Sequence, residues 1–249
     1  MQDSSHLSDV LACEERLVNC WPAIDTLLMD GWVVRAANGY SGRANSASAV
    51  RIGATLDDAL LREIVRFFRA QGLPPAIRVT PLAAPDVAER LAREGWRIVT
   101  RSGGMIAGRI PQQADRAGFV LTPVVDPIWC SGVSALQDER KRNAEHLYAI
   151  VSRIRREAGF ATVMDEGRAA AFGMVVIDRG MAEIGSIIVN PAARGRGIGR
   201  GLVRGLMAHA AEKGAVRFFL QVEAGNAVAQ RLYASLGFED LYPYVEYRL

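Results

Sequence analysis

A glycine-rich segment between a strand-like run and a helical pattern most constrains how this chain can fold. The segment extends from Arg194 to Gly199 and follows the apolar run from Ile184 to Val189. Beyond it, apolar residues recur at helical spacing until Gly214, a residue type that commonly ends helices. These patterns predict that a buried strand turns into a helix at the glycines, as happens in α/β proteins.

The first turn of such a helix can bind an anion. Its first backbone N–H groups have no partners within the helix and carry the positive end of the helix dipole. Gly195, Gly197 and Gly199 allow a phosphate to approach the bare backbone. Arg194 and Arg196 add positive charge and fork-shaped hydrogen-bond donors. An ordinary glycine-rich turn with solvated arginines is the alternative.

The glycine spacing argues against a dinucleotide-binding loop. A G-x-G-x-x-G frame started at Gly195 requires a glycine at position 200, where Arg200 stands, and the two later frames fail in the same way. The pattern R-x-x-G-x-G fits instead, with Arg194, Gly197 and Gly199. This motif resembles the pyrophosphate-binding signature of the GNAT superfamily of acyl-CoA-dependent N-acyltransferases.

A strand and a short helix are predicted after the glycine-rich segment. The run from Val216 to Val222 has the length and composition of a strand, and we expect it to pair with the strand at 182–189. Asn226 is a good helix N-cap, and Gly237 is placed to end the helix that follows.

The stretch from Asn226 to Phe238 is similar to the GNAT element N-x-x-A-x-x-L-Y-x-x-x-G-F. The resemblance implies that Asn226 contacts the pantetheine arm of CoA. It also implies that Tyr233 directs its hydroxyl at the thioester sulfur and returns a proton to it. A core aromatic residue with a solvated hydroxyl is the alternative for Tyr233, because that residue lies beside the apolar face of the helix.

Glu183 stands eleven residues before Arg194. The resemblance implies that a glutamate at this spacing accepts a proton from the acceptor amine, usually through water. An ammonium cannot attack a carbonyl, and a carboxylate partly removed from water is a suitable base. The alternative is a solvated residue in the polar phase of an alternating strand.

The resemblance further implies an acetyl-CoA-dependent N-acetyltransferase that needs no metal and transfers the acetyl group directly to an amine. Backbone groups of Ile188 and Val189 are expected to pair with the pantetheine as a pseudo-strand and to polarise the thioester carbonyl. The expected contacts of the pyrophosphate lie at Arg194, Gly195, Arg196, Gly197, Ile198, Gly199 and Arg200. A CoA-binding regulatory or scaffold module without turnover and a nucleotide-dependent oxidoreductase are the competing functions.

The first hundred residues resemble a degenerate copy of the same fold. A predicted helix from Asp57 to Ala70 leads into a predicted strand from Ala76 to Thr80, in the order found after the glycine-rich segment. The stretch 88–96 is similar to 229–238 but lacks the tyrosine, and no R-x-x-G-x-G motif precedes Asp57. This asymmetry resembles bacterial tandem GNAT proteins, and it predicts a lobe that shapes the acceptor site without binding the cofactor. An unrelated α/β lobe is the alternative.

The predicted architecture is therefore an α/β fold of two tandem GNAT-like lobes, with a mixed central sheet flanked by helices. We expect the degenerate lobe at residues 1–110 and the catalytic domain at 117–249, joined by a proline-broken linker at 109–115. Within the second lobe we expect one long helical region from about 126 to 157 and a closing strand near 245–249.

Arg43 and Asn45 lie on a turn between two predicted strands. Side chains of this kind commonly fix a turn by hydrogen bonds to its backbone. Contact with the acceptor in a cleft between the lobes is the alternative.

Composition indicates a soluble globular protein. Of its 249 residues 50% are hydrophobic and 23% charged, and the net charge of +3 is too small to indicate a nucleic-acid partner. No apolar run approaches the roughly 20 residues that span a bilayer, and the N-terminus has no signal-peptide core. We therefore expect a cytoplasmic protein without a membrane partner. Cys13, Cys20 and Cys130 lack disulfide and zinc spacing and are expected to be thiols. The sequence leaves the amine acceptor and the oligomeric state open.

Overall fold

The computed structural model describes residues 4–108, 118–139 and 142–249. The chain forms two compact units. The first comprises Met1–Gly104, Val222–Gly225 and Asp240–Leu249, and the second comprises Met105–Gln221 and Asn226–Glu239. The expected linker at 109–115 falls outside the described residues, and the domain bounds 1–110 and 117–249 stay a prediction.

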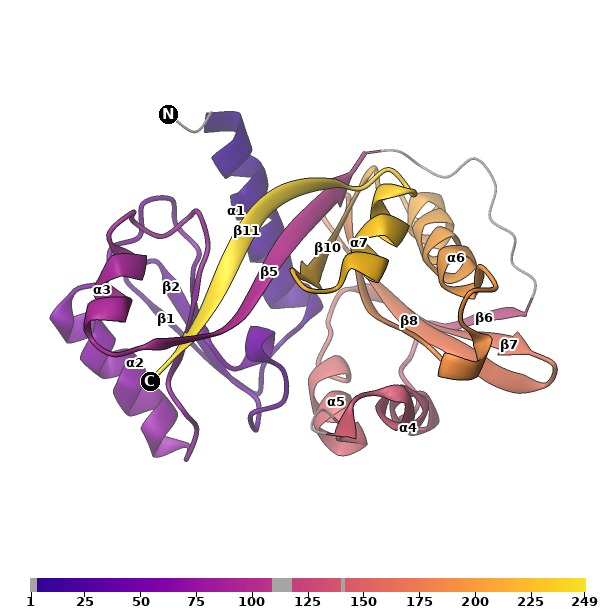
Figure 1. Ribbon diagram of the computed structural model, residues 1–249, viewed down its shortest axis with the longest axis horizontal. Coiled ribbons are helices and arrows are strands. Elements are labelled where there is room, and N and C mark those ends of the chain that lie inside the picture. Colours follow the sequence, from indigo (N-terminus) through magenta and orange to yellow (C-terminus); the bar gives the residue numbers. More distant parts are fainter. Residues whose placement is uncertain (1–3, 109–117, 140–141) are drawn as a thin grey trace. The chain divides into compact units, whose positions relative to one another are not determined.

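The first unit contains both helices and strands (Figure 1). In chain order they are α1 (Ser4–Cys20), β1 (Asp25–Met29), β2 (Trp32–Ala36), the 3-10 turn η1 (Gly42–Ala44), β3 (Ala47–Ala49), α2 (Asp58–Ala70), β4 (Ala76–Val79), α3 (Val87–Arg93) and β5 (Arg97–Ala107). The strands follow the order β1-β2-β3-β4-β11-β5, where β11 (Glu239–Arg248) is the last strand of the chain. The division between the units passes through β5, after Gly104.

The helix predicted between Asp57 and Ala70 is confirmed as α2. Asp57 is its N-cap, and the side chain of this residue accepts a hydrogen bond from Leu60 N at 2.8 Å. Leu60, Leu61, Ile64 and Phe68 are buried at helical spacing, so the apolar stripe visible in the sequence faces the core.

The last strand belongs to the first unit, contrary to our expectation that it closes the second lobe. Asp240–Leu249 groups with the first unit, and β11 pairs antiparallel with β4 from Val245↔Val79 to Arg248↔Ala76. The strand itself was predicted, but its partner was not. Consecutive elements usually lie next to one another, and that rule favours the lobe that precedes the strand.

The second unit contains a mixed sheet with helices around it. Its elements are β6 (Phe119–Thr122), α4 (Pro127–Leu136), α5 (Ala144–Val151), β7 (Glu157–Asp165), β8 (Arg168–Asp178), β9 (Met181–Val189), the 3-10 turn η3 (Pro191–Ala193), α6 (Ile198–Glu212), most of β10 (Arg217–Glu223) and α7 (Ala227–Ala234). Neighbours from β6 to β9 are antiparallel, whereas β10 is parallel to β9. This arrangement confirms the predicted α/β class with a mixed sheet.

The described residues of the helical region expected from 126 to 157 contain two separate α-helices. The first, α4, ends at Leu136, and α5 begins after Asn143, whose side chain accepts a hydrogen bond from His146 N at 2.8 Å. Asparagine is a strong N-cap, so it starts a new helix where the apolar pattern suggested continuity. The strand β7 already begins at Glu157.

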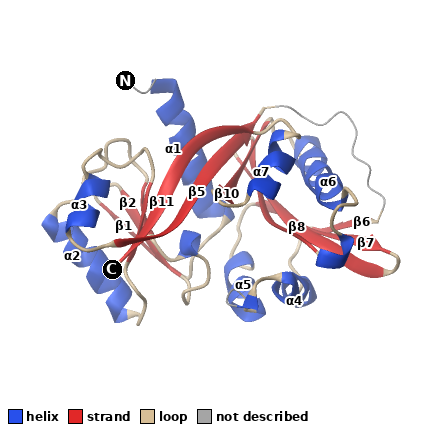
Figure 2. Ribbon diagram, in the orientation of Figure 1, coloured by secondary structure: helices blue, strands red, loops and turns tan. Residues whose placement is uncertain are grey.

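Different helices cover the two faces of β8 and β9 (Figure 2). A Cβ added at Gly132 of α4 would lie 2.3 Å from the ring of Phe172. A Cβ added at Gly173 would lie 3.1 Å from Leu206 and 3.2 Å from Leu202, both in α6. Because successive side chains of a strand point to opposite faces, α4 covers the face of Phe172 and α6 covers the other.

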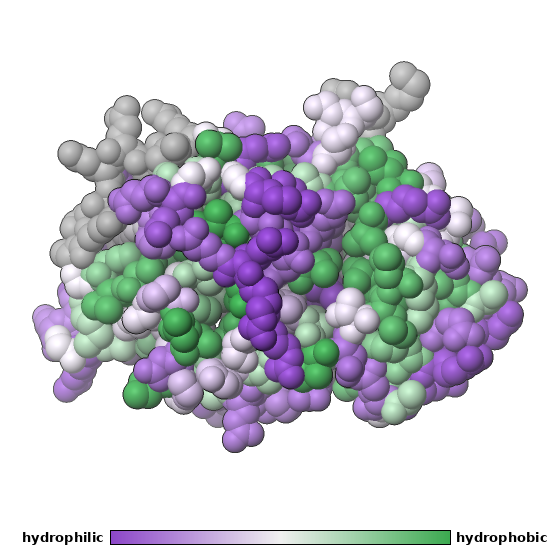
Figure 3. All heavy atoms as spheres, turned by 180° about the vertical axis from the view of Figure 1, so that it is seen from behind, coloured by the Kyte–Doolittle hydropathy of each residue, from purple (hydrophilic) through white to green (hydrophobic). Residues whose placement is uncertain are grey.

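The surface carries both hydrophilic and hydrophobic residues. On the face shown in Figure 3, hydrophilic and hydrophobic residues alternate without either kind covering it. Among the described residues, no helix is long and apolar enough to cross a membrane. Cys13, Cys20 and Cys130 are buried thiols, and burial raises the pKa of the Cys130 thiol to about 12.

Candidate active site

The glycine-rich segment forms the turn into α6, as predicted. Gly195 and Gly197 have φ angles of +77° and +79°, in the left-handed region that side-chain-bearing residues rarely adopt. Gly197 is the N-cap, and the first helical hydrogen bond runs from Gly201 N to Gly197 O at 3.0 Å. The N–H groups of the three residues between them therefore have no acceptor within the helix.

The space above this turn is open. A Cβ added at Gly195 or Gly197 would meet no other atom within 4 Å. An anion can thus reach the exposed backbone N–H groups without displacing a side chain. The turn fits a pyrophosphate by this criterion, and the left-handed backbone explains why two of its glycines stand where they do.

The two arginines of the motif have different partners. The guanidinium of Arg194 donates from Nε to the backbone oxygen of Val189 at 3.3 Å. The guanidinium of Arg196 forms a bidentate ion pair with Asp165 at the end of β7, with distances of 2.5 and 3.1 Å. Hydrogen bonding to Asp165 also raises the pKa of Arg196. Sequence reasoning missed Asp165, because no local pattern relates a strand end to a loop so far along the chain.

A bulge bends β9 before it reaches the glycines. Between Met174↔Gly185 and Phe172↔Ile188 the strand β9 holds one residue more than β8, and Ser186 has a φ of +53°. Bulges re-aim the strand that carries them and occur often beside active sites. The sequence gives no sign of this bulge, because serine has no preference for a left-handed backbone.

Glu183 lies at the end of the pairing between β9 and β10. Among the described residues the parallel ladder runs from Arg217↔Met181 to Phe219↔Glu183. Ile188 and Val189 lie beyond it. At these two residues the backbone edge of β9 that faces β10 is therefore outside the ladder. The sequence predicts contact with the pantetheine at the same two residues.

The side chain of Glu183 is completely buried, at 0% exposure. A Cβ added at Gly185 would lie 3.5 Å from Glu183 Oε1 and 3.5 Å from Met174 Cε. Glu183 therefore shares the face of Met174 and Phe172, the one that α4 covers. The alternative of a solvated strand residue is wrong. The catalytic role of Glu183 stays a prediction.

The helix α7 places the two remaining candidates. Asn226 is its N-cap, with Oδ1 accepting a hydrogen bond from Ala229 N at 3.1 Å. The ring of Tyr233 is buried and meets Phe238 edge to face, with centroids 6.0 Å apart. The capping role of Asn226 is thus confirmed, and the ring of Tyr233 does pack in the core. The roles predicted for both residues toward CoA stay predictions.

Gly199 brings three of these elements together. A Cβ added there would lie 3.3 Å from Val189 Cγ2 at the end of β9 and 3.6 Å from Leu232 Cδ2 in α7. The turn, β9 and α7 therefore meet at this glycine. Leu232 is also the chain neighbour of Tyr233. Glu183 lies farther back along β9, about 20 Å from Val189 at roughly 3.3 Å per residue.

Asn45, in the first unit, fixes a turn. Its Oδ1 accepts hydrogen bonds from Ala37 N at 2.7 Å and Gly39 N at 2.9 Å, and its Nδ2 donates to Tyr40 O at 2.7 Å. The guanidinium of Arg43 lies 4.8 Å from the centre of the Trp21 ring. The turn-fixing interpretation of Asn45 is confirmed. Contact of either residue with an acceptor stays a prediction.

Comparison with known proteins agrees with this geometry. The chain matches the family described as "Probable histone acetyltransferase Rv0428c C-terminal" over residues 7–244. It is 26% identical over 243 residues to the uncharacterized N-acetyltransferase YobR of Bacillus subtilis, covering 94% of this chain and 96% of that protein.

Two solved structures show the same fold. A GCN5-related N-acetyltransferase from Kribbella flavida matches with a TM-score of 0.71 and 18% identity, covering 100% of this chain and 96% of that one. A tandem GNAT protein from the clavulanic acid biosynthesis pathway matches with a TM-score of 0.64 and 15% identity, covering 100% and 95%. Since the family match extends over nearly the whole chain, the protein belongs to this acetyltransferase family, within the GNAT superfamily of N-acetyltransferases.

Proposed function

We propose that this N-acetyltransferase takes its acetyl group from acetyl-CoA and transfers it directly to a primary amine. The observation that carries the proposal is the turn into α6, where left-handed Gly195 and Gly197 leave three backbone N–H groups open to an anion. Bound acetyl-CoA would supply the acetyl group as an activated thioester. Its pyrophosphate is the group that this turn suits.

The end of β9 is proposed to hold the pantetheine arm. Ile188 and Val189 follow the last paired residue of the ladder with β10, so their backbone groups on that edge can pair with the amides of the arm. A backbone N–H at this position can also polarise the thioester carbonyl. Asn226 begins α7, and its Nδ2 group can donate to the arm while Oδ1 caps the helix.

Glu183 is proposed to accept the proton that the ammonium form of the acceptor must lose, directly or through water. The residue lies inside the protein, at the end of the β9–β10 ladder. A carboxylate removed from water accepts a proton more readily than a solvated one. Burial therefore supports the role of a base.

Tyr233 is proposed to donate a proton from Oη to the departing thiolate. The ordinary pKa of a phenol is about 10, so the hydroxyl is protonated at neutral pH and is available as the donor. The edge contact with Phe238 fixes the plane of the ring. Leu232, beside Tyr233, packs against Gly199, which links the position of α7 to the anion-binding turn.

A calorimetric titration of the whole chain with acetyl-CoA tests the proposal together with an assay of thiol release. The assay uses a panel of small amines, peptides with a free N-terminus and lysine-containing peptides. We expect one acetyl-CoA per chain, because only the second unit has the arginine-glycine turn, and release of free thiol with at least one class of amine. Binding without release on any acceptor would instead identify a CoA-binding module, and the absence of binding would contradict the cofactor site.

A further inference from the structure

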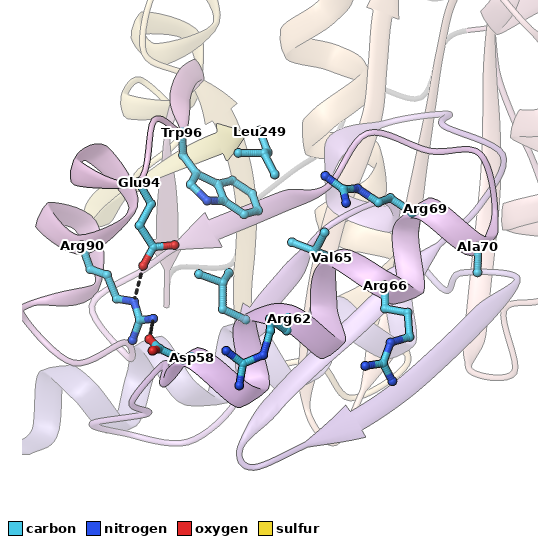
Figure 4. Close-up of a pocket in the computed structure, with 11 residues that line it drawn as sticks. Asp58, Arg62, Val65, Arg66, Arg69, Ala70, Arg90, Glu94, Trp96 and Leu249 are labelled. Atoms are coloured by element: carbon cyan, nitrogen blue, oxygen red, sulfur yellow. Dashed lines mark hydrogen bonds and ion pairs between the residues drawn. The ribbon is translucent and has the colours of Figure 1, made fainter.

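A groove in the first unit has no part in the proposed acetyl transfer. It lies between α2, α3, the residue before β5 and the residue after β11, and its volume is about 830 Å³ (Figure 4). Small-molecule sites in proteins occupy about 300–1,000 Å³ and combine apolar walls with a few polar groups. The groove is therefore large enough for a ligand of drug-like size.

The walls of the groove are apolar. Leu61 and Trp96 are 6% and 5% exposed, so packing holds both of them in place. Val65 and Leu249 complete the apolar lining, and Figure 4 shows the indole of Trp96 lying across from Val65. Because only 5% of Trp96 is exposed, an apolar ligand meets the exposed edge of the indole together with Val65 and Leu249, and it gains from the burial of apolar area.

Three arginines of α2 line the same groove. Arg62, Arg66 and Arg69 recur at spacings of four and three, so they share one side of the helix. Arg66 pairs with Glu63 at 3.0 Å, whereas Arg62 and Arg69 have no ion-pair partner in the part of the chain that the structure describes. Figure 4 shows Arg69 extending toward Trp96 and Leu249.

On the opposite side of the groove, one arginine is shared by two carboxylates. Arg90 of α3 pairs with both Asp58 and Glu94, and it also donates to Leu56 O. Both acidic groups of the lining are thus engaged with Arg90. The lining holds four arginines against these two carboxylates, and Glu63 pairs with one of the four, so a net positive charge remains on the side of Arg62 and Arg69. An unbalanced guanidinium beside an apolar wall favours an anion with an apolar body and disfavours a cationic ligand.

We propose that this groove is a binding site for a small aromatic carboxylate. The carboxylate forms a bidentate pair with the guanidinium of Arg69, supported by the field of Arg62. The aromatic body lies against Val65, Leu249 and the exposed edge of Trp96. The groove shares no residue with the anion-binding turn, since all of its lining residues belong to the first unit and the turn belongs to the second.

The test measures binding of 2-naphthoate to the intact chain by calorimetry and by saturation-transfer NMR. The neutral probe 2-naphthylmethanol has the same ring system without the charge. We expect 2-naphthoate to bind at least about tenfold more tightly than the alcohol, as expected for a charge-assisted pair on a partly apolar surface. Equal binding of the two probes, or no binding of 2-naphthoate, would overturn the proposal.

Variants locate the site. Arg69→Gln should weaken 2-naphthoate binding about tenfold, while Arg93→Gln, an exposed arginine of α3 outside the groove, should leave it unchanged. Affinity for acetyl-CoA should stay the same in both variants, which separates this proposal from the proposed transfer. If both variants bind 2-naphthoate as the unchanged protein does, or if both bind it more weakly, the assignment is contradicted. It is also contradicted if a glutamate-rich peptide displaces 2-naphthoate at a concentration lower than the neutral probe requires, because the groove then binds an acidic protein segment.

Discussion

Glu183 is the residue on which the proposed chemistry most depends, and its burial makes a clean test possible. Glutamine keeps the size of the side chain but cannot accept the proton. We expect Glu183→Gln to lower kcat/KM for an amine by about 10²-fold or more at neutral pH. Toward higher pH the amine loses its proton unaided, so the variant should approach the wild type. Steady-state rates measured from about pH 6 to about pH 10 check this.

Glu239→Gln is the matched control, because Glu239 is an exposed glutamate of the same unit. Its pH–rate profile should match that of the unchanged protein. If Glu183→Gln gives the same profile as this control, Glu183 is a structural residue and the base must be sought elsewhere.

A buried polar cluster in the first unit offers a second test at single residues. Arg78 donates to both carboxylate oxygens of Glu14, at 3.1 and 3.2 Å, and lies 4.2 Å from the centre of the Tyr244 ring. Tyr242 donates its hydroxyl to the same carboxylate. Burial, with the charge of Glu14, raises the pKa of Tyr242 well above its ordinary value.

This shift makes stability depend on pH in a defined direction. The folded protein keeps the Tyr242 phenol protonated, whereas an unfolded tyrosine ionises near pH 10. The contribution of the Tyr242 hydroxyl to the free energy of unfolding is therefore complete below about pH 10. It is lost as the pH rises through the pKa of Tyr242 in the folded protein. Urea unfolding above about pH 10 should show a free energy of unfolding that falls about 1.4 kcal/mol per pH unit more steeply in the wild type than in Tyr242→Phe.

At neutral pH Tyr242→Phe should lower the free energy of unfolding by about 1–3 kcal/mol, because the buried carboxylate loses a donor. Tyr148→Phe, at an exposed position of α5, is the control. Equal slopes for the wild type and Tyr242→Phe would show that the hydroxyl of Tyr242 is not held protonated by the fold.

At the scale of an element, the N-terminus of α6 is the part of the protein that the cofactor proposal uses. Gly197→Asp places a carboxylate beside the open N–H groups, and aspartate tolerates the left-handed backbone better than most residues. We expect the affinity for acetyl-CoA to fall at least about tenfold through repulsion of the pyrophosphate. Calorimetric titration measures the loss, and circular dichroism shows whether the fold is kept.

Gly214→Asp provides the control for this helix. Gly214 follows the C-terminus of α6 with a φ of +88°, and an added Cβ there would also meet no atom within 4 Å. The substitution thus introduces the same charge and a similar backbone strain at the opposite end. Equal loss of affinity in the two variants would remove the argument for an anion site at the N-terminus.

At the scale of the whole molecule, the two units are interleaved along the chain. The strand β11 completes the first unit and buries Tyr242, Tyr244 and Tyr247, although it follows α7 of the second. Burial of one large apolar side chain contributes about 1.5–3 kcal/mol, so these three together approach the total stability of about 5–15 kcal/mol. A chain ending at Glu239 should therefore lose cooperative unfolding of its first unit.

Hydrogen exchange of the amides in α2 and β4 measures this loss, since both elements belong to the first unit. A chain ending at Arg248 keeps β11 and is the control. If the chain ending at Glu239 protects these amides as well as the control does, the first unit is stable without its last strand.

The sequence by itself determined the features that depend on neighbours along the chain. The glycines at the start of α6, the caps Asp57 and Asn226, and the apolar stripe of α2 were all predictable, because turn geometry, capping and helical periodicity act over a few residues. The same local signals identified the family and the α/β class.

Only the tertiary structure decided which distant residues meet. Tyr242 and Glu14 are separated by 228 positions, and Arg78 and Glu14 by 64, so no local spacing relates them. The complete burial of Glu183 likewise depends on the strands and helices around it, and the bulge at Ser186 occurs in a residue without a left-handed preference. Burial and strand partners are set by the packing of the whole chain, and a pattern of neighbouring residues does not contain that information.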